Sequence, residues 1–176
     1  MHKWVLLLRG INVGGNNRLP MKDLVALLES LGSTNVKTYI QSGNAVVLSP
    51  YSNRKEFSKN LANAIFETRG FRPLIHLMTT KEFEAAAALN PFPQAADDPK
   101  SLHLSFLSDT PKPEGLKTLQ ALKSPTEHFE ILGKVLYLHA PDGIGRSKLA
   151  AGVEKSLGVS ATGRNWRTVE NLLALI

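Results

Sequence analysis

Hydrophobic and polar positions alternate along the chain in a pattern that predicts short strands and amphipathic helices. Residues 4–8 are continuously apolar, which is typical of a central strand buried on both faces. After residue 8, some segments repeat apolar residues every three or four positions, as helices do, and others at every second position, as strands do. Gly or Asn stands where one pattern gives way to the next. The elements expected in the first part are a strand at 4–8, a helix at 21–31, strands at 36–41 and 44–48, a helix at 53–70 and a strand at 73–78.

This order, β-α-β-β-α-β, is that of the split βαβ or ferredoxin-like fold. In that topology the first strand lies beside the third and antiparallel to it. The loop that follows Leu8 is therefore expected at the same sheet edge as the Ser42-Gly43 turn. Two polar segments that are far apart in the sequence would then meet.

The rest of the chain predicts a second series of the same kind. Thr79 to Glu82 has the spacing of a helix capping box, and residues 90–100, with three prolines, are interpreted as a linker. The elements expected afterwards are strands at 102–107, 127–132 and 134–139, helices at 114–122 and from Ser147, a short extended piece at 159–161 and a last helix carrying Val169 and Leu172. The predicted fold is α+β, with two ferredoxin-like subdomains and antiparallel sheets: 1–79, a helix and linker at 80–100, and 101–176.

Composition narrows the class of protein. The 176 residues are 43% hydrophobic, enough for a real core, and they include no cysteine, which excludes disulfides, thiolate metal sites and a cysteine nucleophile. The apolar run at 4–8 is too short for a signal peptide or a membrane span, so we expect a cytoplasmic protein with no membrane partner. A net charge of +6 favours anionic partners.

The first candidate site is the glycine- and asparagine-rich loop after Leu8. Asn16-Asn17 stands where a P-loop requires Lys-Ser or Lys-Thr, and the glycine intervals do not fit a dinucleotide turn. What remains is a backbone nest with amide donors between two arginines, which suits an anion. The alternative is a sharp turn that needs Gly and Asn for left-handed backbone angles. The ligand-binding residues predicted here are Arg9, Asn12, Gly14, Gly15, Asn16 and Arg18.

The second candidate is the turn that contains Gln41, Ser42 and Asn44. By itself it is an ordinary hairpin turn. Its functional interpretation depends on the predicted topology, which brings its amides and hydroxyl against the first loop.

The third candidate is the segment 162–168, where Arg164, Asn165 and Arg167 surround Trp166 at a helix start. Arginine forks suit phosphate or carboxylate, and an indole offers a stacking face. The alternative is a capped helix with a buried tryptophan and solvated arginines. Ser147-Lys148 is open to the same two interpretations, anion contact or helix cap.

Signatures of catalysis are scarce, and whether the protein is an enzyme stays open. The five histidines form no H-x-x-x-H pattern, although His103 and His139 can meet in space, and no G-x-S-x-G elbow occurs. We therefore predict no metal site and no cofactor, and no catalytic residue is assigned.

Three stretches together, 7–15, 38–44 and 162–168, resemble the domain of unknown function 1697 family. Pro20-Met21 and Ser147-Lys148 add to the likeness, which runs nearly end to end. The resemblance implies a fold of two ferredoxin-like subdomains. It implies no reaction, because no biochemical function is established for the family.

We therefore expect a protein that binds a small anionic ligand, phosphorylated or nucleotide-like. One alternative is a nucleic-acid-binding module, but the strand at 44–48 lacks the aromatic residues that such sheets use, and Tyr137 and Phe106 are expected on opposite faces. Another alternative is a non-catalytic interaction protein. The sequence does not predict an oligomeric state.

Overall fold

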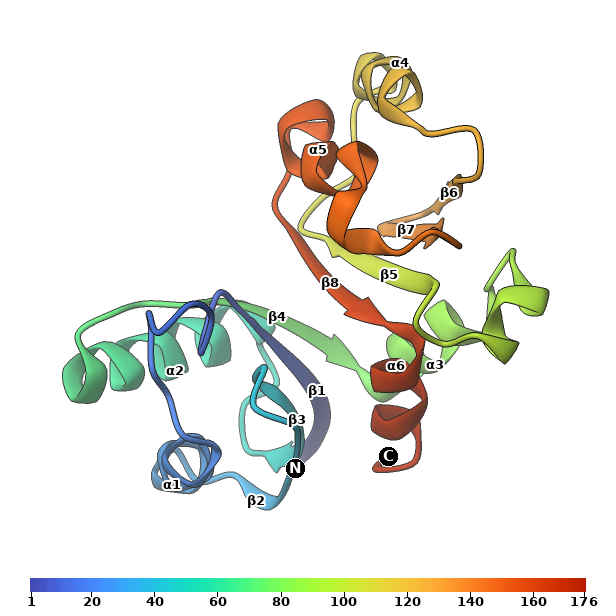
Figure 1. Ribbon diagram of the computed structural model, residues 1–176. Coiled ribbons are helices and arrows are strands. Elements are labelled where there is room, and N and C mark those ends of the chain that lie inside the picture. The colour runs from blue at the N-terminus through green and yellow to red at the C-terminus, as the bar shows by residue number, and fades with distance from the viewer. The chain divides into compact units, whose positions relative to one another are not determined.

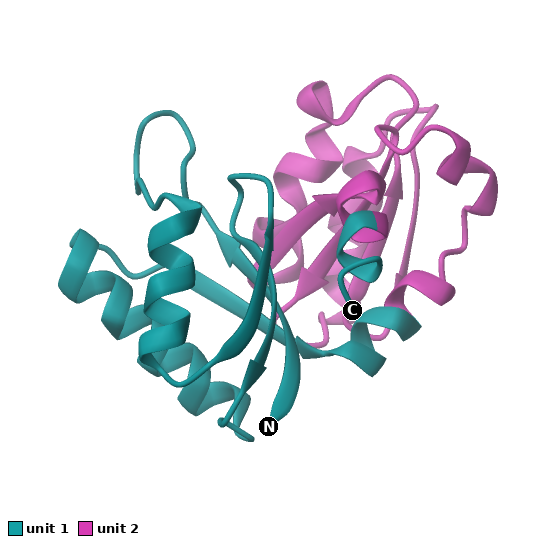
Figure 2. Cartoon of the chain, turned by 90° about the horizontal axis from the view of Figure 1, so that it is seen from below, with its two compact units in different colours: residues 1–85, 171–176 teal, residues 86–170 magenta.

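The computed structural model describes all 176 residues, and their contacts divide the chain into two units (Figure 2). Unit 1 consists of Met1–Ala85 together with Asn171–Ile176, and unit 2 consists of Ala86–Glu170. The chain passes between the units within two helices, α3 (Thr80–Ala88) and α6 (Trp166–Leu173). None of the helices combines the length and the apolar character that crossing a membrane requires.

Unit 1 has the predicted split βαβ layout. Its elements are β1 (His2–Arg9), α1 (Met21–Ser30), β2 (Thr34–Tyr39), β3 (Asn44–Ser49), α2 (Arg54–Arg69) and β4 (Leu74–Thr79). The sheet order is β2-β3-β1-β4, and β1 is antiparallel to both of its neighbours, as Figure 1 allows the reader to follow. The predicted fold class is therefore confirmed for this unit.

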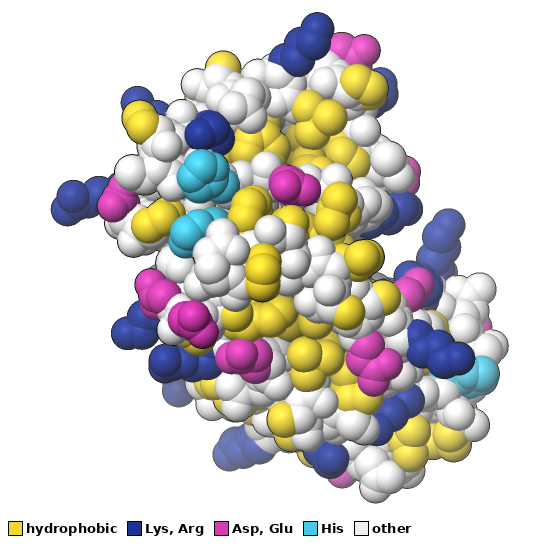
Figure 3. All heavy atoms as spheres, turned by 90° about the vertical axis from the view of Figure 1, so that its right-hand side faces the viewer, with side chains coloured by type: hydrophobic (Ala, Val, Ile, Leu, Met, Phe, Trp, Pro, Cys, Tyr) yellow, Lys and Arg dark blue, Asp and Glu magenta, His cyan; other side chains and the backbone are white.

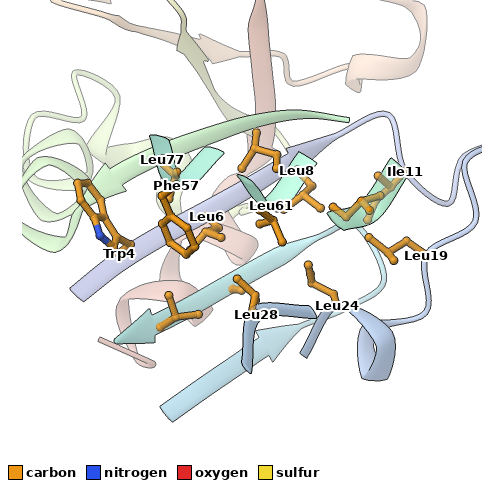
Figure 4. Close-up of a cluster of buried hydrophobic side chains, with 14 of the residues drawn as sticks. Trp4, Leu6, Leu8, Ile11, Leu19, Leu24, Leu28, Phe57, Leu61 and Leu77 are labelled. Atoms are coloured by element: carbon orange, nitrogen blue, oxygen red, sulfur yellow. The ribbon is translucent and has the colours of Figure 1, made fainter. Parts of the chain in front are cut away.

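The central position of β1 explains its continuous apolar run. Leu6 and Leu8 point into a cluster with residues of both helices, among them Leu24 of α1 and Leu61 of α2 (Figure 4). Leu7, between them in sequence, lies on the opposite face and is also fully buried. A strand that buries both faces needs no polar alternation.

The ends of the unit 1 helices follow the local sequence. The Asn53 side chain accepts hydrogen bonds from the N–H groups of Lys55 and Glu56, which caps α2, and Gly70 ends that helix with a left-handed φ of 78°. At the start of α3, Thr79 and Glu82 form the predicted capping box, with Thr79 N to Glu82 Oε2 at 2.8 Å and Glu82 N to Thr79 Oγ1 at 3.2 Å.

Glu82 also connects α3 to α2. Its carboxylate forms an ion pair with Arg54 at 2.8 Å, and the Arg54 guanidinium lies 5.8 Å from the centre of the Trp4 ring. Partial burial raises the pKa of Glu82, but the hydrogen bonds from Arg54 and Thr79 outweigh burial and bring the pKa below its usual value. The charged form of this carboxyl is thus favoured in the fold.

The last residues of the chain pack against the first unit. The Lys3 ammonium donates a hydrogen bond to the main-chain oxygen of Ile176, and Lys37 Nζ donates to Leu175 O at 3.2 Å. Unit 1 is therefore built from both ends of the sequence.

Unit 2 repeats the layout. Its elements are η1 (Pro93–Asp97), β5 (Leu102–Leu107), α4 (Pro113–Leu122), β6 (His128–Leu132), β7 (Val135–His139), η2 (Ile144–Arg146), α5 (Lys148–Leu157) and β8 (Ala161–Asn165). The sheet order, β6-β7-β5-β8, corresponds strand for strand to that of unit 1. Leu107, Leu136 and Leu138 pack there against Leu119 of α4 and Val153 of α5.

Two segments differ from the prediction. The predicted linker contains the 3-10 helix η1, and Phe92 and Ala95 in it are buried, because Phe92 packs near His139 with ring centres 6.1 Å apart. Residues 161–165 form strand β8 on β5, in a register that places Arg164 opposite Leu104. Because these residues lack an apolar alternation, only a short extended piece at 159–161 was predicted there.

The expectation that Tyr137 and Phe106 lie on opposite faces is wrong. Tyr137 is opposite Leu104 in the β5–β7 ladder, and Leu104 shares a face with Phe106. Both rings are buried. The Tyr137 hydroxyl donates to Ala86 O at 2.7 Å, and burial raises its pKa to about 12.

Candidate functional site

The loop between β1 and α1 is a small hairpin anchored at both ends. The anchors are Ile11 and Leu19, whose side chains are buried in the unit 1 core (Figure 4). Between them, Asn12 N donates to Asn17 O at 3.1 Å and Asn16 N donates to Val13 O at 3.0 Å.

Gly14 and Gly15 are the two central residues of this hairpin, with φ of 58° and 80°. Two successive positive φ angles are typical of the tight turns that join antiparallel strands. The turn alone therefore explains both glycines, as the second interpretation of this motif expected.

Asn12 ties the loop to the β2–β3 turn. Its Nδ2 donates to Leu19 O at 2.8 Å and to Gln41 O at 2.7 Å, and its Oδ1 accepts from Leu19 N at 2.8 Å. In addition, Leu8 N donates to Gly43 O at 2.8 Å. The prediction that these two segments meet at one sheet edge is confirmed, and we call residues 9–18 and 40–43 the loop edge.

Asn44 holds the turn from inside. Its side chain is 0% exposed, and Nδ2 donates to Tyr39 O at 3.0 Å and to Ser42 Oγ at 2.9 Å. Gly43 has a φ of 76°, and a Cβ there would lie 2.6 Å from Leu8 Cβ and 2.7 Å from Ile11 Cδ1. These two residues position the turn, whereas Gln41 is exposed at its tip.

The loop edge is exposed and basic. Arg9, Asn16 and Arg18 are exposed, and the Arg18 side chain forms no ion pair or hydrogen bond within the protein. No Asp or Glu occurs in residues 9–20 or 40–44. The positive charge at this edge therefore has no acidic neighbour in either segment.

The corresponding edge of unit 2 has a different character. Its loop between β5 and α4 has five residues, against eleven between β1 and α1. The link to the hairpin turn is the same, because Leu107 N donates to Lys134 O at 2.8 Å. Here, however, Lys134 is paired with Asp109 at 2.9 Å, and that hydrogen bond lowers the pKa of Asp109. Two equivalent edges of one fold thus differ in loop length and in charge pairing.

The third predicted motif lies on β8 and α6. Arg164 Nη1 donates to Gly163 O at 2.8 Å, and burial lowers the Arg164 pKa to about 10. Asn165 Oδ1 accepts from the N–H and the hydroxyl of Thr168, both at 2.9 Å, which makes it the cap of α6. Arg167 is exposed.

Two polar atoms of residues two positions from Arg164 in the sequence, Thr162 Oγ1 and Trp166 Nε1, are buried without a hydrogen-bond partner. This motif belongs to the β8–α6 segment and the first two belong to the loop edge of unit 1. That all three line one site stays a prediction.

Sequence reasoning missed a charged cavity in unit 2. It singled out Ser147 and Lys148 but not Lys123 or Glu127, which line the same cavity. Ser147 does cap α5, with Oγ accepting from Ala150 N at 2.9 Å. One feature of the sequence could have pointed to Glu127. It lies three residues after Ser124, the spacing at which a carboxylate accepts a hydrogen bond from a backbone N–H.

His103 and His139, which the sequence allowed to meet, lie on opposite faces of the unit 2 sheet. His139 is opposite His128 in the β6–β7 ladder, with ring centres 6.4 Å apart. His103 is opposite Leu138, so it faces away from His139. Burial lowers the pKa of His103, and this effect outweighs the hydrogen bond with Lys100 O, which raises it. No group of three or more His, Cys, Asp or Glu is arranged to hold a metal ion.

The fold and the loop edge define an α+β protein of two ferredoxin-like sheets with a basic, glycine-rich hairpin on the first sheet. Over residues 1–137 the sequence matches the family described as Protein of unknown function (DUF1697), and the chain belongs to this family. The matched range contains the loop edge but not Arg164, Asn165 or Arg167.

No curated protein matches the chain. Among solved structures, the chain is similar to the conserved bacterial protein SP0830 from Streptococcus pneumoniae, with 22% sequence identity and a TM-score of 0.77. The match covers 98% of this chain and 97% of that one. At this identity the likeness shows the fold alone.

Proposed function

We propose that the protein binds a small anionic ligand, phosphorylated or nucleotide-like, at the loop edge of unit 1. Arg9 and Arg18 supply the charge, and the exposed hairpin N–H groups of Gly14 and Gly15 and the amides of Asn16 and Gln41 supply hydrogen bonds. Asn12, Ser42 and Asn44 also belong to the predicted ligand-binding set, and their hydrogen bonds hold the loop and the turn in place for the ligand. Arg164, Asn165 and Arg167 are not needed for this proposal.

The observation that carries the proposal is the contrast between the two equivalent edges. Unit 2 shows that the fold closes this edge with a five-residue loop and a paired lysine. Unit 1 uses a longer, internally hydrogen-bonded hairpin and leaves Arg18 without a partner. Long, ordered loops that folding does not require are commonly functional.

The test is a thermal-shift titration with inorganic phosphate, pyrophosphate and adenosine monophosphate at constant ionic strength. We expect at least one of them to raise the melting temperature in a saturable way. Arg18→Ala removes one charge-assisted contact, at about 1.5–3 kcal/mol, which corresponds to a dissociation constant raised about tenfold to a hundredfold.

Lys22→Ala is the matched control, because Lys22 is an exposed cation in α1 outside the loop edge. It lowers the net charge equally, so it should leave the titration almost unchanged. Equal weakening by both variants, or no stabilisation by any of these anions, would contradict the proposal.

A second function, a surface for a partner protein, is favoured by two exposed apolar side chains on the loop edge. Val13 is 66% exposed and Ile40 is 51% exposed. Isolated exposed apolar residues are common, but both of these lie on segments joined by Asn12. Retention of a cellular protein by the chain but not by a Val13→Ser, Ile40→Ser variant would favour this function.

The nucleic-acid alternative receives less support. Tyr137 and Phe106 are buried and cannot stack on bases. On the face drawn in Figure 3, acidic and basic side chains are interspersed rather than gathered into one basic surface. RNA binding that weakens steeply with salt would revive it.

A further inference from the structure

Unit 2 contains a cavity of about 560 Å³ beside the N-terminal end of α5. Ala121, Leu122 and Ala140 give it an apolar wall, and most of the remaining lining is polar or charged. The volume lies in the range of small-molecule sites, about 300–1,000 Å³. The charged side chains around it are Lys123, Glu127, Asp142, Arg146 and Lys148.

Glu127 is a nearly buried carboxylate without a cationic partner. The residue is only 5% exposed, and its Oε2 accepts from Ser124 N at 2.9 Å. Its Oε1 accepts no hydrogen bond within the protein. The nearest lysine in sequence, Lys123, donates instead to the main-chain oxygens of Glu127 at 2.8 Å and Ser124 at 3.3 Å. A buried charge is costly unless it is paired, so this carboxylate favours a cation in the cavity.

The opposite charge is found on the α5 side of the cavity. Lys148 is the first residue of the helix and Arg146 precedes it by two, and both are exposed and form no ion pair. The first N–H groups of a helix have no intrahelical acceptor and carry partial positive charge. Ser147 Oγ satisfies only the N–H of Ala150 among them. This side of the cavity therefore favours an anionic group.

We propose that this cavity binds a small zwitterion, a molecule with an amine at Glu127 and a carboxylate or phosphate at the start of α5. An anion alone would be repelled by Glu127, and a cation alone by Lys148 and Arg146. The cavity lies in unit 2, so the proposal does not depend on the anion site at the loop edge.

The test is isothermal titration calorimetry of the full chain with two kinds of probe, a pool of free L-amino acids and O-phosphoethanolamine. Sodium phosphate, sodium acetate and methylammonium chloride serve as single-charge controls. We expect at least one zwitterion to bind at least about tenfold more tightly than each control, as two charge-assisted contacts require. The two kinds of probe distinguish a carboxylate from a phosphate ligand.

Glu127→Gln preserves the shape of the side chain and an oxygen for Ser124 N, but removes the charge. It should weaken zwitterion binding about tenfold or more, and Lys148→Ala should do the same. The matched controls are Glu130→Gln on β6 and Lys155→Ala on α5, both exposed and outside the lining. Arg18→Ala, in unit 1, should also leave zwitterion binding unchanged.

Three results would overturn the proposal: no zwitterion binding below about 10 mM, a single-charge control that binds as tightly as the best zwitterion, or equal effects of Glu127→Gln and Glu130→Gln. If Glu127→Gln does not fold, the comparison of Lys148→Ala with Lys155→Ala provides the decision. Loss of zwitterion binding in Arg18→Ala would place the ligand at the loop edge instead.

Discussion

Replacement of Gly43 by alanine tests whether the loop and the β2–β3 turn are packed as described. The new Cβ would lie 2.6 Å from Leu8 Cβ and 2.7 Å from Ile11 Cδ1, whereas carbon atoms normally approach to about 3.5–4.0 Å. The turn and the strand cannot easily move apart, because Leu8 belongs to the central strand and its N–H donates to Gly43 O at 2.8 Å. Gly43→Ala must therefore distort the turn or the core beneath it.

Gly15→Ala is the matched control. Gly15 has a φ of 80° and Gly43 one of 76°, so both substitutions force alanine into left-handed backbone, at about 1–2 kcal/mol. Only Gly43 adds steric overlap, because nothing lies within 4 Å of a Cβ built at Gly15. Overpacking costs about 1–3 kcal/mol, so Gly43→Ala should lower the free energy of unfolding by about 2–5 kcal/mol in total.

The measurement is urea denaturation followed by tryptophan fluorescence. In a Trp166→Phe background, Trp4 in the unit 1 core becomes the only reporter, and the exchange removes no hydrogen bond because Trp166 Nε1 has no partner. If the two alanine variants lie within about 0.5 kcal/mol of each other, the close approach of the turn to Leu8 and Ile11 is refuted.

Two further predictions concern the loop and the capping box. Asn12→Gly should lower the free energy of unfolding by about 1–3 kcal/mol, because the Asn12 side chain makes three hydrogen bonds. Asn17→Gly is the control and should cost less, because Asn17 has a similar φ, 50° against 54°, but makes only one side-chain hydrogen bond. Equal losses in urea denaturation would count against the linking role of Asn12. The lowered pKa of Glu82 means that its contribution to stability is present above the unfolded value of 4.5 and is lost as the pH falls through the folded pKa. Glu82→Gln should therefore lower the free energy of unfolding at neutral pH and make it fall less steeply as the pH is lowered below 4.5. A fall as steep as that of the unchanged protein would refute this.

Local signals in the sequence sufficed for most of the fold. The continuous apolar run of β1, the Asn53 cap and the Thr79–Glu82 capping box act through neighbours only a few residues away. Their geometry can therefore be predicted without knowing the rest of the chain. The strand order followed from the element order, because few connections of β-α-β-β-α-β are allowed.

The strand β8 could not be predicted in the same way. Gly163 and Arg164 break the apolar alternation, and the segment is extended because its backbone pairs with β5. That pairing partner is about sixty residues away in the sequence, and pairing over such a separation leaves no local signature.

The meeting of the loop and the turn was predicted, but the hydrogen bonds by which Asn12 and Asn44 hold them were not. The sequence placed the loop and the turn at one edge, yet an asparagine that binds a ligand and one that holds a loop look alike. Asn44 follows a turn and begins a strand, and only the structure shows that its amide points inward to Tyr39 O. The charged cavity of unit 2 escaped notice because Glu127 and Lys148 are distant in sequence and each is ordinary in its own segment.

The packing of Leu175 and Ile176 on unit 1 has a consequence for how the protein is made. Synthesis delivers residues 1–85 first, but the residues that accept hydrogen bonds from Lys3 and Lys37 are translated only after residues 86–170. The first sheet can form early, while its final contacts must wait until all of unit 2 has been translated. A nascent chain halted anywhere before residue 171 would therefore carry an unfinished first unit, exposed to proteases and chaperones for as long as translation pauses.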